Sequence, residues 1–324
     1  MTIESNLESN RSEELDNLLT QLEPRLLAYI DEADPKSSNY KPESLGTFHE
    51  PKFLKQQFID PDNDLDKPCS EEELFETIDK VLKFSVNTWN PGFLDKLYAS
   101  NNPIGVISDI LLSILNTNSH VYTVSPVLSV LENYIGKKYA QLFFHNETCG
   151  GLTFSGGSWS NITSLQIARS LKYPDTKVKG NGNYKFALYT SKHCHYSVEK
   201  GAILLGLGSE NVFKVDVDEN GVMDVDSLKQ VIEKTKKEGY TPLYINATAG
   251  TTVFGSYDPF LEISKVAKEH NIHFHIDGSW GGNVIFSPKY RDRLAGSEYA
   301  DSITVNPHKM LGIPNTCSFL LLPQ

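Results

Sequence analysis

After residue 150 the chain alternates between short apolar runs and longer segments with apolar residues at helical spacing. The short runs suit strands and cover residues 185–191, 212–217, 243–248, 273–277 and 302–306. The helical segments lie near residues 159–172, 196–206, 226–238 and 259–270. Strands that alternate with helices predict an α/β fold, with a mostly parallel sheet covered by helices on both faces.

The first part of the chain has a different pattern. Residues 1 to about 85 are acidic and rich in Asn, Ser and Pro, with leucines at helical spacing between Leu15 and Leu22, which predicts a loose arm with one or two helices. From residue 103 two apolar stretches, Ile104 to Ile114 and Leu128 to Ile135, predict packed helices. We therefore expect an N-terminal acidic arm and helical segment over residues 1–102, and a large α/β domain over residues 103–324.

Composition and charge narrow the class of protein. A chain of 324 residues that is 39% hydrophobic is long enough to bury a large core. The net charge of −11 argues against nucleic acid or an anionic membrane surface as the main partner, although a basic pocket for an acidic small molecule remains compatible with it. The acidic, polar first residues and the absence of a long apolar run favour the cytoplasm. Four scattered cysteines fit a reducing compartment, since they have neither zinc-site spacing nor disulfide density.

Polar side chains gather directly after the predicted strands. Thr248 ends one strand, Asp277 ends another, Lys309 follows a third, and His195 lies just beyond the strand that ends at Ser191. In open α/β sheets the ligand lies beyond the carboxyl ends of the strands, so we expect these side chains to share one site.

Lys309 and Asp277 form the most informative pair in that set. A lysine amine can form a Schiff base with an aldehyde, and a buried carboxylate can keep a pyridine nitrogen protonated. Pyridoxal phosphate requires both groups. Each residue taken alone has a plainer explanation, because an aspartate at a strand end often caps a helix and most lysines are solvated.

A glycine turn, Gly156 and Gly157, opens the apolar helix that begins near residue 159. Glycines let a backbone approach a ligand closely, and helix N-terminal amides attract anions, so the turn is a candidate phosphate site. Such a turn is more often an ordinary helix start.

A metal site is the competing interpretation. His193 and His195 would point the same way in an extended segment, as would His273, His275 and Asp277, so either set could supply ligands. This alternative leaves Lys309 without a role and identifies no water-activating base, and our prediction is no metal.

A set of short motifs between about residues 87 and 322 resembles the group II pyridoxal-phosphate-dependent decarboxylases, closest to the glutamate and cysteine sulfinate decarboxylases. The motifs are Asn116-Thr117-Asn118 with Pro126-Val127, Gly156-Gly157 with Asn161, His195-Tyr196-Ser197, Asn246-Ala247-Thr248-Ala249-Gly250-Thr251-Thr252, Asp258-Pro259, Trp280-Gly281-Gly282, and Asn306-Pro307-His308-Lys309-Met310. The resemblance implies the type I, aspartate aminotransferase-like fold of pyridoxal phosphate enzymes.

The resemblance also implies roles for individual residues. Lys309 would carry the cofactor as a Schiff base, Asp277 would pair with the pyridine nitrogen, and His195 would stack on the ring. The remaining cofactor contacts implied by the resemblance are Gly157, Ser158, Asn306 and His308 around the phosphate and Thr248 beside Asp277. The implied reaction is decarboxylation of an amino acid, with glutamate, cysteine sulfinate and aspartate as the candidate substrates, in a homodimer.

Three departures from the family pattern affect what can be carried over. The family's Asp-Ala-Ala-Trp is Asp277-Gly278-Ser279-Trp280 here, and a Phe-Asn-Gln-Leu run that helps hold an acidic substrate is Phe93-Leu94-Asp95-Lys96-Leu97. Lys96 is therefore a substrate-binding candidate, and a solvated surface lysine is an equally good explanation for it. The chain ends 15 residues after Lys309, so it resembles a truncated member that lacks the C-terminal small domain. A cofactor- or partner-binding form without turnover is the alternative function.

Overall fold

The computed structural model describes residues 10–59, 68–94 and 96–324. The chain divides into two compact units, Met1–Ser100 and Asn101–Gln324, and every residue of the second unit is described. Among the described residues, no helix is both long enough and apolar enough to span a membrane.

The first unit is helical. Its described elements are α1 (Arg11–Asp31), the 3₁₀ helix η1 (Pro42–Leu45), α2 (Pro51–Phe58) and α3 (Glu71–Phe84). Capping boxes start α1 and α3, because the side chains of Asn10 and Ser70 accept from the helix backbone while Glu13 and Glu73 bond back to the caps. Arg25 Nε pairs with Asp79 Oδ1 at 3.0 Å between α1 and α3. The described part of this unit therefore holds three α-helices, more than the one or two that the leucine spacing predicts.

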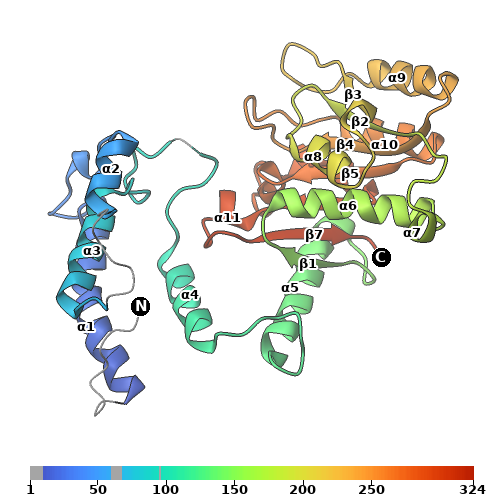
Figure 1. The fold of residues 1–324 in the computed structure, drawn as a ribbon. Helices are drawn as coiled ribbons and strands as arrows, with labels where there is room; N and C mark the ends of the chain where they lie inside the picture. Colours follow the sequence, from blue (N-terminus) through green and yellow to red (C-terminus); the bar gives the residue numbers. More distant parts are fainter. Residues whose placement is uncertain (1–9, 60–67, 95) are drawn as a thin grey trace. The chain divides into compact units, whose positions relative to one another are not determined.

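The second unit is built on a seven-stranded sheet in the order β1-β7-β6-β5-β4-β2-β3 (Figure 1). The strands are β1 (Gly150–Phe154), β2 (Phe186–Ser191), β3 (Val212–Val215), β4 (Thr241–Thr248), β5 (His273–Gly278), β6 (Ser302–Val305) and β7 (Ser318–Leu322). β2 to β6 run parallel, whereas β7 is antiparallel to β6 and β1 is antiparallel to β7. The five strands predicted from the apolar runs are confirmed, with ends shifted by one or two residues.

The two antiparallel strands, β1 and β7, were not predicted. Two of the five residues of β1 are glycines, and only Leu152-Thr153-Phe154 can carry an alternation of apolar and polar side chains, so its sequence gives a weak strand signal. Its pairing with β7 depends on a partner more than 160 residues away. Local periodicity cannot reveal such a contact.

Helices cover both faces of this sheet (Figure 1). The α-helices of the second unit are α4 (Pro103–Leu115), α5 (Pro126–Phe144), α6 (Gly157–Lys172), α7 (Thr176–Lys179), α8 (Ser197–Leu204), α9 (Val225–Lys237), α10 (Phe260–Glu269) and α11 (Pro307–Met310), with 3₁₀ helices η2 (Ser209–Asn211), η3 (Gly281–Phe286), η4 (Arg291–Leu294) and η5 (Ser297–Tyr299). The predicted helices near 159–172, 196–206, 226–238 and 259–270 are confirmed as α6, α8, α9 and α10.

Side chains alternate between the two faces, as a period of two requires. Leu188 and Tyr244 join the cluster that packs with α6 and α8, whereas Ala187 and Tyr189 join the larger cluster with α5, α9 and α10. Tyr244 pairs in register with His273, so His275 and Asp277, two and four residues further along β5, also face α6. This alternation decides which helix meets the candidate site.

Of the two apolar helices that precede the sheet, α4 is not packed as predicted, whereas α5 packs against the sheet through one face that includes Tyr139 and Phe143. On α4, Ile104, Ile107 and Ile114 are 80%, 65% and 61% exposed, and on α5 the side chains of Leu131 and Ile135 are also largely exposed. Helical spacing shows that an apolar face needs a cover, but it cannot show that the cover lies within the same chain. Within the second unit this face is open, and exposed apolar surface of this extent marks an interaction site.

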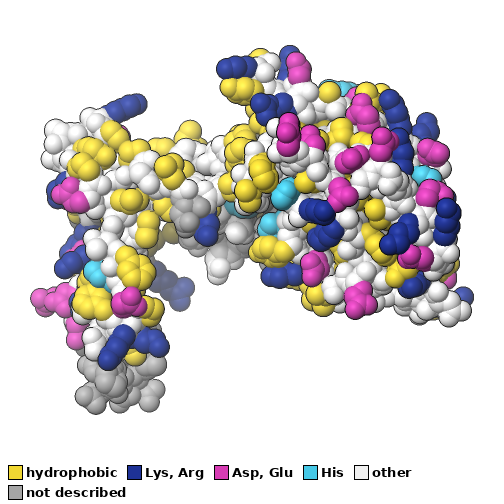
Figure 2. Space-filling model, turned by 90° about the horizontal axis from the view of Figure 1, so that it is seen from above, with side chains coloured by type: hydrophobic (Ala, Val, Ile, Leu, Met, Phe, Trp, Pro, Cys, Tyr) yellow, Lys and Arg dark blue, Asp and Glu magenta, His cyan; other side chains and the backbone are white. Residues whose placement is uncertain are grey.

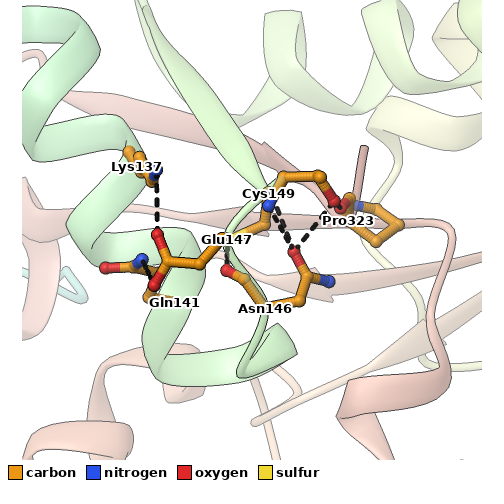
Figure 3. A network of polar contacts seen from close by, with 7 residues as sticks. Lys137, Gln141, Asn146, Glu147, Cys149 and Pro323 are labelled. Carbon is orange, nitrogen blue, oxygen red and sulfur yellow. Dashed lines mark hydrogen bonds and ion pairs between the residues drawn. The ribbon is translucent and has the colours of Figure 1, made fainter.

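A polar network fixes the turn from α5 to β1 (Figure 3). Asn146 Oδ1 accepts from the backbone of Cys149 at 2.7 Å, and the Thr148 hydroxyl reaches the carbonyl of Pro323 at 3.2 Å. Lys137 on α5 pairs with Glu147 at 3.1 Å. The turn is thereby tied to the end of β7, which helps hold the antiparallel edge in register.

The surface carries charges of both signs. The face of the second unit seen in Figure 2 has acidic and basic side chains interspersed. Exposed pairs such as Lys229–Asp226 and Lys236–Glu233 add little to stability because solvent screens them, so the fold depends on its two buried clusters.

Candidate active site

The carboxyl edge of the parallel strands brings the predicted side chains together. Thr248 at the end of β4 pairs in register with Asp277 on β5, and Asp277 pairs with Thr304 on β6. Lys309 lies in α11, directly after β6, and His195 lies between β2 and α8. Lys309 and His195 are both close enough to Asp277 to interact with it electrostatically.

Asp277 is held as an anion although it is 3% exposed. Burial alone would raise its pKa, but hydrogen bonding from Ser279 and electrostatic interactions with His195 and Lys309 outweigh burial and hold the pKa below its ordinary value. Oδ1 accepts from the backbone of Ser279 at 3.0 Å, and Oδ2 accepts from Nδ2 of Asn161 at 2.9 Å. Both carboxylate oxygens are thus oriented by the protein.

Lys309 is half-buried, and burial lowers the pKa of its amine although Asp277 opposes that shift. A lowered pKa increases the neutral fraction of the amine at neutral pH. The neutral amine is the form that attacks a carbonyl, so this environment suits a lysine nucleophile.

The His195 ring is fixed by the first turn of α8. Its Nδ1 accepts from the backbone amide of Ser197 at 3.2 Å and lies 2.9 Å from the Ser197 hydroxyl. Because the amide can only donate, Nδ1 is the unprotonated nitrogen and the neutral ring carries its hydrogen on Nε2. Burial, with the charges of Lys309 and Lys200, lowers its pKa despite Asp277, which favours this neutral form.

The glycine turn lies against the segment that carries Lys309. Gly156 has φ +100°, and α6 starts at Gly157 without a capping bond from any described side chain. A Cβ built on Gly157 would lie 2.5 Å from Ser279 Oγ and 2.7 Å from Asn306 Nδ2, so only glycine fits there. Ser158 follows in the same first turn. The uncapped amides and the adjacent Asn306 amide form a compact set of hydrogen-bond donors suited to a phosphate.

Several buried polar atoms at this edge lack a partner among the described residues. They are Thr248 Oγ1, Thr304 Oγ1 and Asn306 Oδ1. An unpaired buried polar atom costs about 1–3 kcal/mol, so such atoms usually have a bound ligand or water. Together with the close approach at Gly157, they fit a polar cofactor between α6 and the strand ends.

Two of the predicted site residues, His308 and Lys96, are not placed at this edge as clearly as the others. His308 is half-buried and its Nδ1 lies 3.1 Å from the backbone nitrogen of Cys317, so only Nε2 remains for a ligand. Lys96 belongs to the first unit, and its role as a substrate contact stays a prediction.

Sequence reasoning did not predict the buried residues that form hydrogen bonds to Asp277 and orient it. Asn161 was noticed only as part of a motif, and His275 only as a possible metal ligand. In the structure both belong to a hydrogen-bond network, in which His273 and His275 each contact the Ser302 hydroxyl, at 2.9 and 2.8 Å. Among the described residues, no group of three or more His, Cys, Asp or Glu side chains is arranged to hold a metal ion.

Comparison with known proteins matches this geometry. The conserved domain of pyridoxal-dependent decarboxylases matches residues 51–323. The chain belongs to this family. An L-aspartate decarboxylase of Metarhizium robertsii is 46% identical over 96% of this chain and 65% of its own length, and the cysteine sulfinic acid decarboxylase of Rattus norvegicus is 38% identical over 90% and 59%. The crystal structure of mouse CSAD superposes with a TM-score of 0.90 at 33% identity, covering 97% of this chain and 65% of that one.

Membership of this decarboxylase family confirms the predicted type I fold and the pyridoxal phosphate cofactor. The chain spans 65% and 59% of the lengths of the two curated relatives. Residues of the matched domain include all of the predicted cofactor contacts, from Gly157 to Lys309.

Proposed function

We propose that this protein uses pyridoxal phosphate to decarboxylate an acidic amino acid, with aspartate and cysteine sulfinate as the favoured substrates. The observation that carries the proposal is the convergence of Lys309, His195 and an ionised, buried Asp277 at one sheet edge. The choice of substrates is supported by two relatives named as L-aspartate and cysteine sulfinic acid decarboxylases.

Each residue at this edge has a distinct role in the proposal. When bound, pyridoxal phosphate supplies an electron sink for the bond to the substrate's α-carboxylate. Lys309 would hold the cofactor through its amine until the substrate binds. Asp277 keeps the proton on the ring nitrogen, because an adjacent anion in a buried site favours the protonated form. His195 packs against the ring, and Gly157, Ser158, Asn306 and His308 hold the phosphate, with Thr248 beside Asp277.

We also propose a homodimer in the cytoplasm. The exposed apolar face of α4 and α5 supports the first part, since a second copy of the chain would remove it from water. The cytoplasmic location is supported by the four cysteines, all of which are free thiols, as is usual in a reducing compartment.

Covalent trapping tests the cofactor role of Lys309. The protein is incubated with pyridoxal phosphate, reduced with borohydride, digested and mapped by mass spectrometry. We expect the label on Lys309 and no label in Lys309→Ala. The matched control is Lys265→Ala, which removes an exposed lysine of α10 and should label like the wild type. A label at another lysine, or none, would overturn the assignment.

Carbon dioxide release from aspartate, cysteine sulfinate and glutamate tests the reaction. Release from one of the first two supports the proposed substrates, and release from glutamate alone would redirect the substrate assignment. Labelling of Lys309 with no release from any of the three would favour the alternative of a binding form without turnover.

A further inference from the structure

We propose that Asn161 is a positioning residue that orients both Asp277 and His195, and that a one-way chain of hydrogen bonds from His273 fixes its amide. This inference rests on the proposed cofactor site. Asn161 lies in the second turn of α6, is 3% exposed, and contacts three polar partners on two other elements: Ser197 on α8, and His275 and Asp277 on β5.

The ionised state of Asp277 determines how the Asn161 amide is turned. An ionised carboxylate only accepts hydrogen bonds, so the atom 2.9 Å from Asp277 Oδ2 must be the donating Nδ2. The second hydrogen of Nδ2 is directed to the Ser197 hydroxyl at 2.9 Å. Both amide hydrogens are then in use, and Oδ1 is left as an acceptor facing His275.

The remaining protons follow in order along the chain. His275 Nε2, 3.0 Å from Asn161 Oδ1, must carry a hydrogen. The neutral ring then has a bare Nδ1, which accepts from the Ser302 hydroxyl at 2.8 Å. The Ser302 hydroxyl has only one hydrogen and donates it to His275. His273 Nε2, 2.9 Å away, must therefore be the donor to the Ser302 oxygen. Every hydrogen bond from His273 to Asp277 therefore donates toward the carboxylate.

The rings in this chain have little freedom. Tyr244 stacks on both imidazoles, with interplanar angles of 4° to His273 and 22° to His275. Burial depresses the pKa of both histidines, to about 4 and about 3, which keeps them neutral as the chain of donors requires. A rigid chain of neutral donors polarises toward the anion and holds it in one orientation.

A branch from Asn161 reaches the predicted ring-stacking residue. Because the Ser197 hydroxyl accepts from Asn161, its own hydrogen is free to donate to His195 Nδ1. One amide thus sets the orientation of the carboxylate predicted to meet the pyridine nitrogen and the tautomer of the histidine predicted to lie over the ring. Residues of this kind support a site without touching the reacting atoms.

The first measurement needs no cofactor. Long-range proton–nitrogen NMR correlations of the ¹⁵N-labelled, cofactor-free protein report which imidazole nitrogen carries the hydrogen. We expect neutral Nε2–H rings at His273, His275 and His195. In Asn161→Leu the His275 ring loses its acceptor while Ser302 can either donate or accept, so its two nitrogen signals should move toward averaged values. An Nδ1–H ring at His275 in the wild type would contradict the proposed direction of the hydrogen bonds from His273 to Asp277.

The second measurement is the dissociation constant for pyridoxal phosphate, from the visible absorbance. Asn161→Leu should weaken binding about 10- to 100-fold, and His275→Leu about 10-fold, since a hydrogen bond to a charged group is lost or loosened. His275→Gln keeps an N–H donor toward Asn161 and should recover most of the affinity. Ser160→Ala is the matched control. Ser160 precedes Asn161 on α6, and its substitution removes a buried hydrogen bond to Ser318, so this variant should bind the cofactor like the wild type.

The outcomes separate the two proposals. If the wild type fails to bind the cofactor, the proposed function fails. The NMR measurement of the histidine tautomers still tests the series of hydrogen bonds from His273 to Asp277. If Asn161→Leu does not fold, as judged by circular dichroism, the pair His275→Leu and His275→Gln carries the test. Equal affinity in those two variants, or wild-type affinity in a folded Asn161→Leu, would overturn the positioning role.

Discussion

The backbone amide of Thr248 donates a hydrogen bond of 2.7 Å to Oδ2 of Asp258, a buried carboxylate ten residues later. The other oxygen of Asp258 accepts from the backbone of Met223 at 2.8 Å. One carboxylate therefore ties the end of β4, where Thr248 faces the site, to the segment before α9. The site edge depends on this contact as well as on the strand ladder.

Asp258 should make the protein less stable as pH rises from about 4 to about 6. Burial raises its pKa to about 6 although both backbone hydrogen bonds oppose the shift. Between the unfolded and folded pKa values the folded state binds the extra proton, so the free energy of unfolding falls with rising pH, by about 3 kcal/mol in total. Urea denaturation of the wild type and of Asp258→Asn from pH 4 to pH 7 measures this change in the free energy of unfolding. The stability difference between them should be larger at pH 4 than at pH 7, and a constant difference would contradict the prediction.

The unpartnered hydroxyl of Thr248 predicts opposite effects on stability and on cofactor binding. Thr248→Val removes a buried polar atom that has no described partner, so the cofactor-free protein should gain about 1 kcal/mol in free energy of unfolding. If that hydroxyl contacts the cofactor, affinity should fall about 10-fold. Thr190→Val is the matched control, because its hydroxyl is also buried and unpartnered on the same face of the sheet, and Thr190 is in register with Asn246, two residues before Thr248. It should stabilise the protein with no change in affinity.

The buried histidines should make the protein less stable as pH falls below about 6.5. Burial lowers the pKa of His275 to about 3 and of His273 to about 4, so the unfolded state binds more protons between those values and 6.5. The free energy of unfolding should then fall with decreasing pH by up to about 1.4 kcal/mol per pH unit for each histidine. Thermal or urea denaturation of wild type and His275→Gln from pH 7 to pH 4 tests this. The glutamine does not titrate, so its curve should be flatter, and parallel curves would exclude the contribution.

The open apolar face of α4 and α5 predicts concentration-dependent association. Ile107→Glu places a charge on this face and should shift the protein toward the monomer in sedimentation equilibrium, because the charge would have to be buried in the interface. Val178→Glu is the control, since Val178 is an isolated exposed side chain on α7 and should leave the mass unchanged. A monomeric wild type at micromolar concentration would contradict the proposed dimer.

Local sequence was enough for much of this fold. Four of the five parallel strands, β2, β4, β5 and β6, are buried on both faces, and this explains mostly apolar runs such as the one that forms β4. The shared site of Lys309, just after β6, and Asp277, near the end of β5, followed from the general rule for open α/β sheets. β1 was missed because it is held by its contact with β7 rather than by its own pattern.

The sequence by itself determined the chemistry of the site: a lysine, an aspartate and a histidine at strand ends, a glycine turn, and motifs of one family. Only the tertiary structure decided which residues support them. The orientation of Asp277 depends on Asn161, 116 residues away in the chain, and on a histidine whose neutral state results from complete burial. Hydrogen-bond direction and burial are properties of neighbours in space, which spacing along a single chain does not encode.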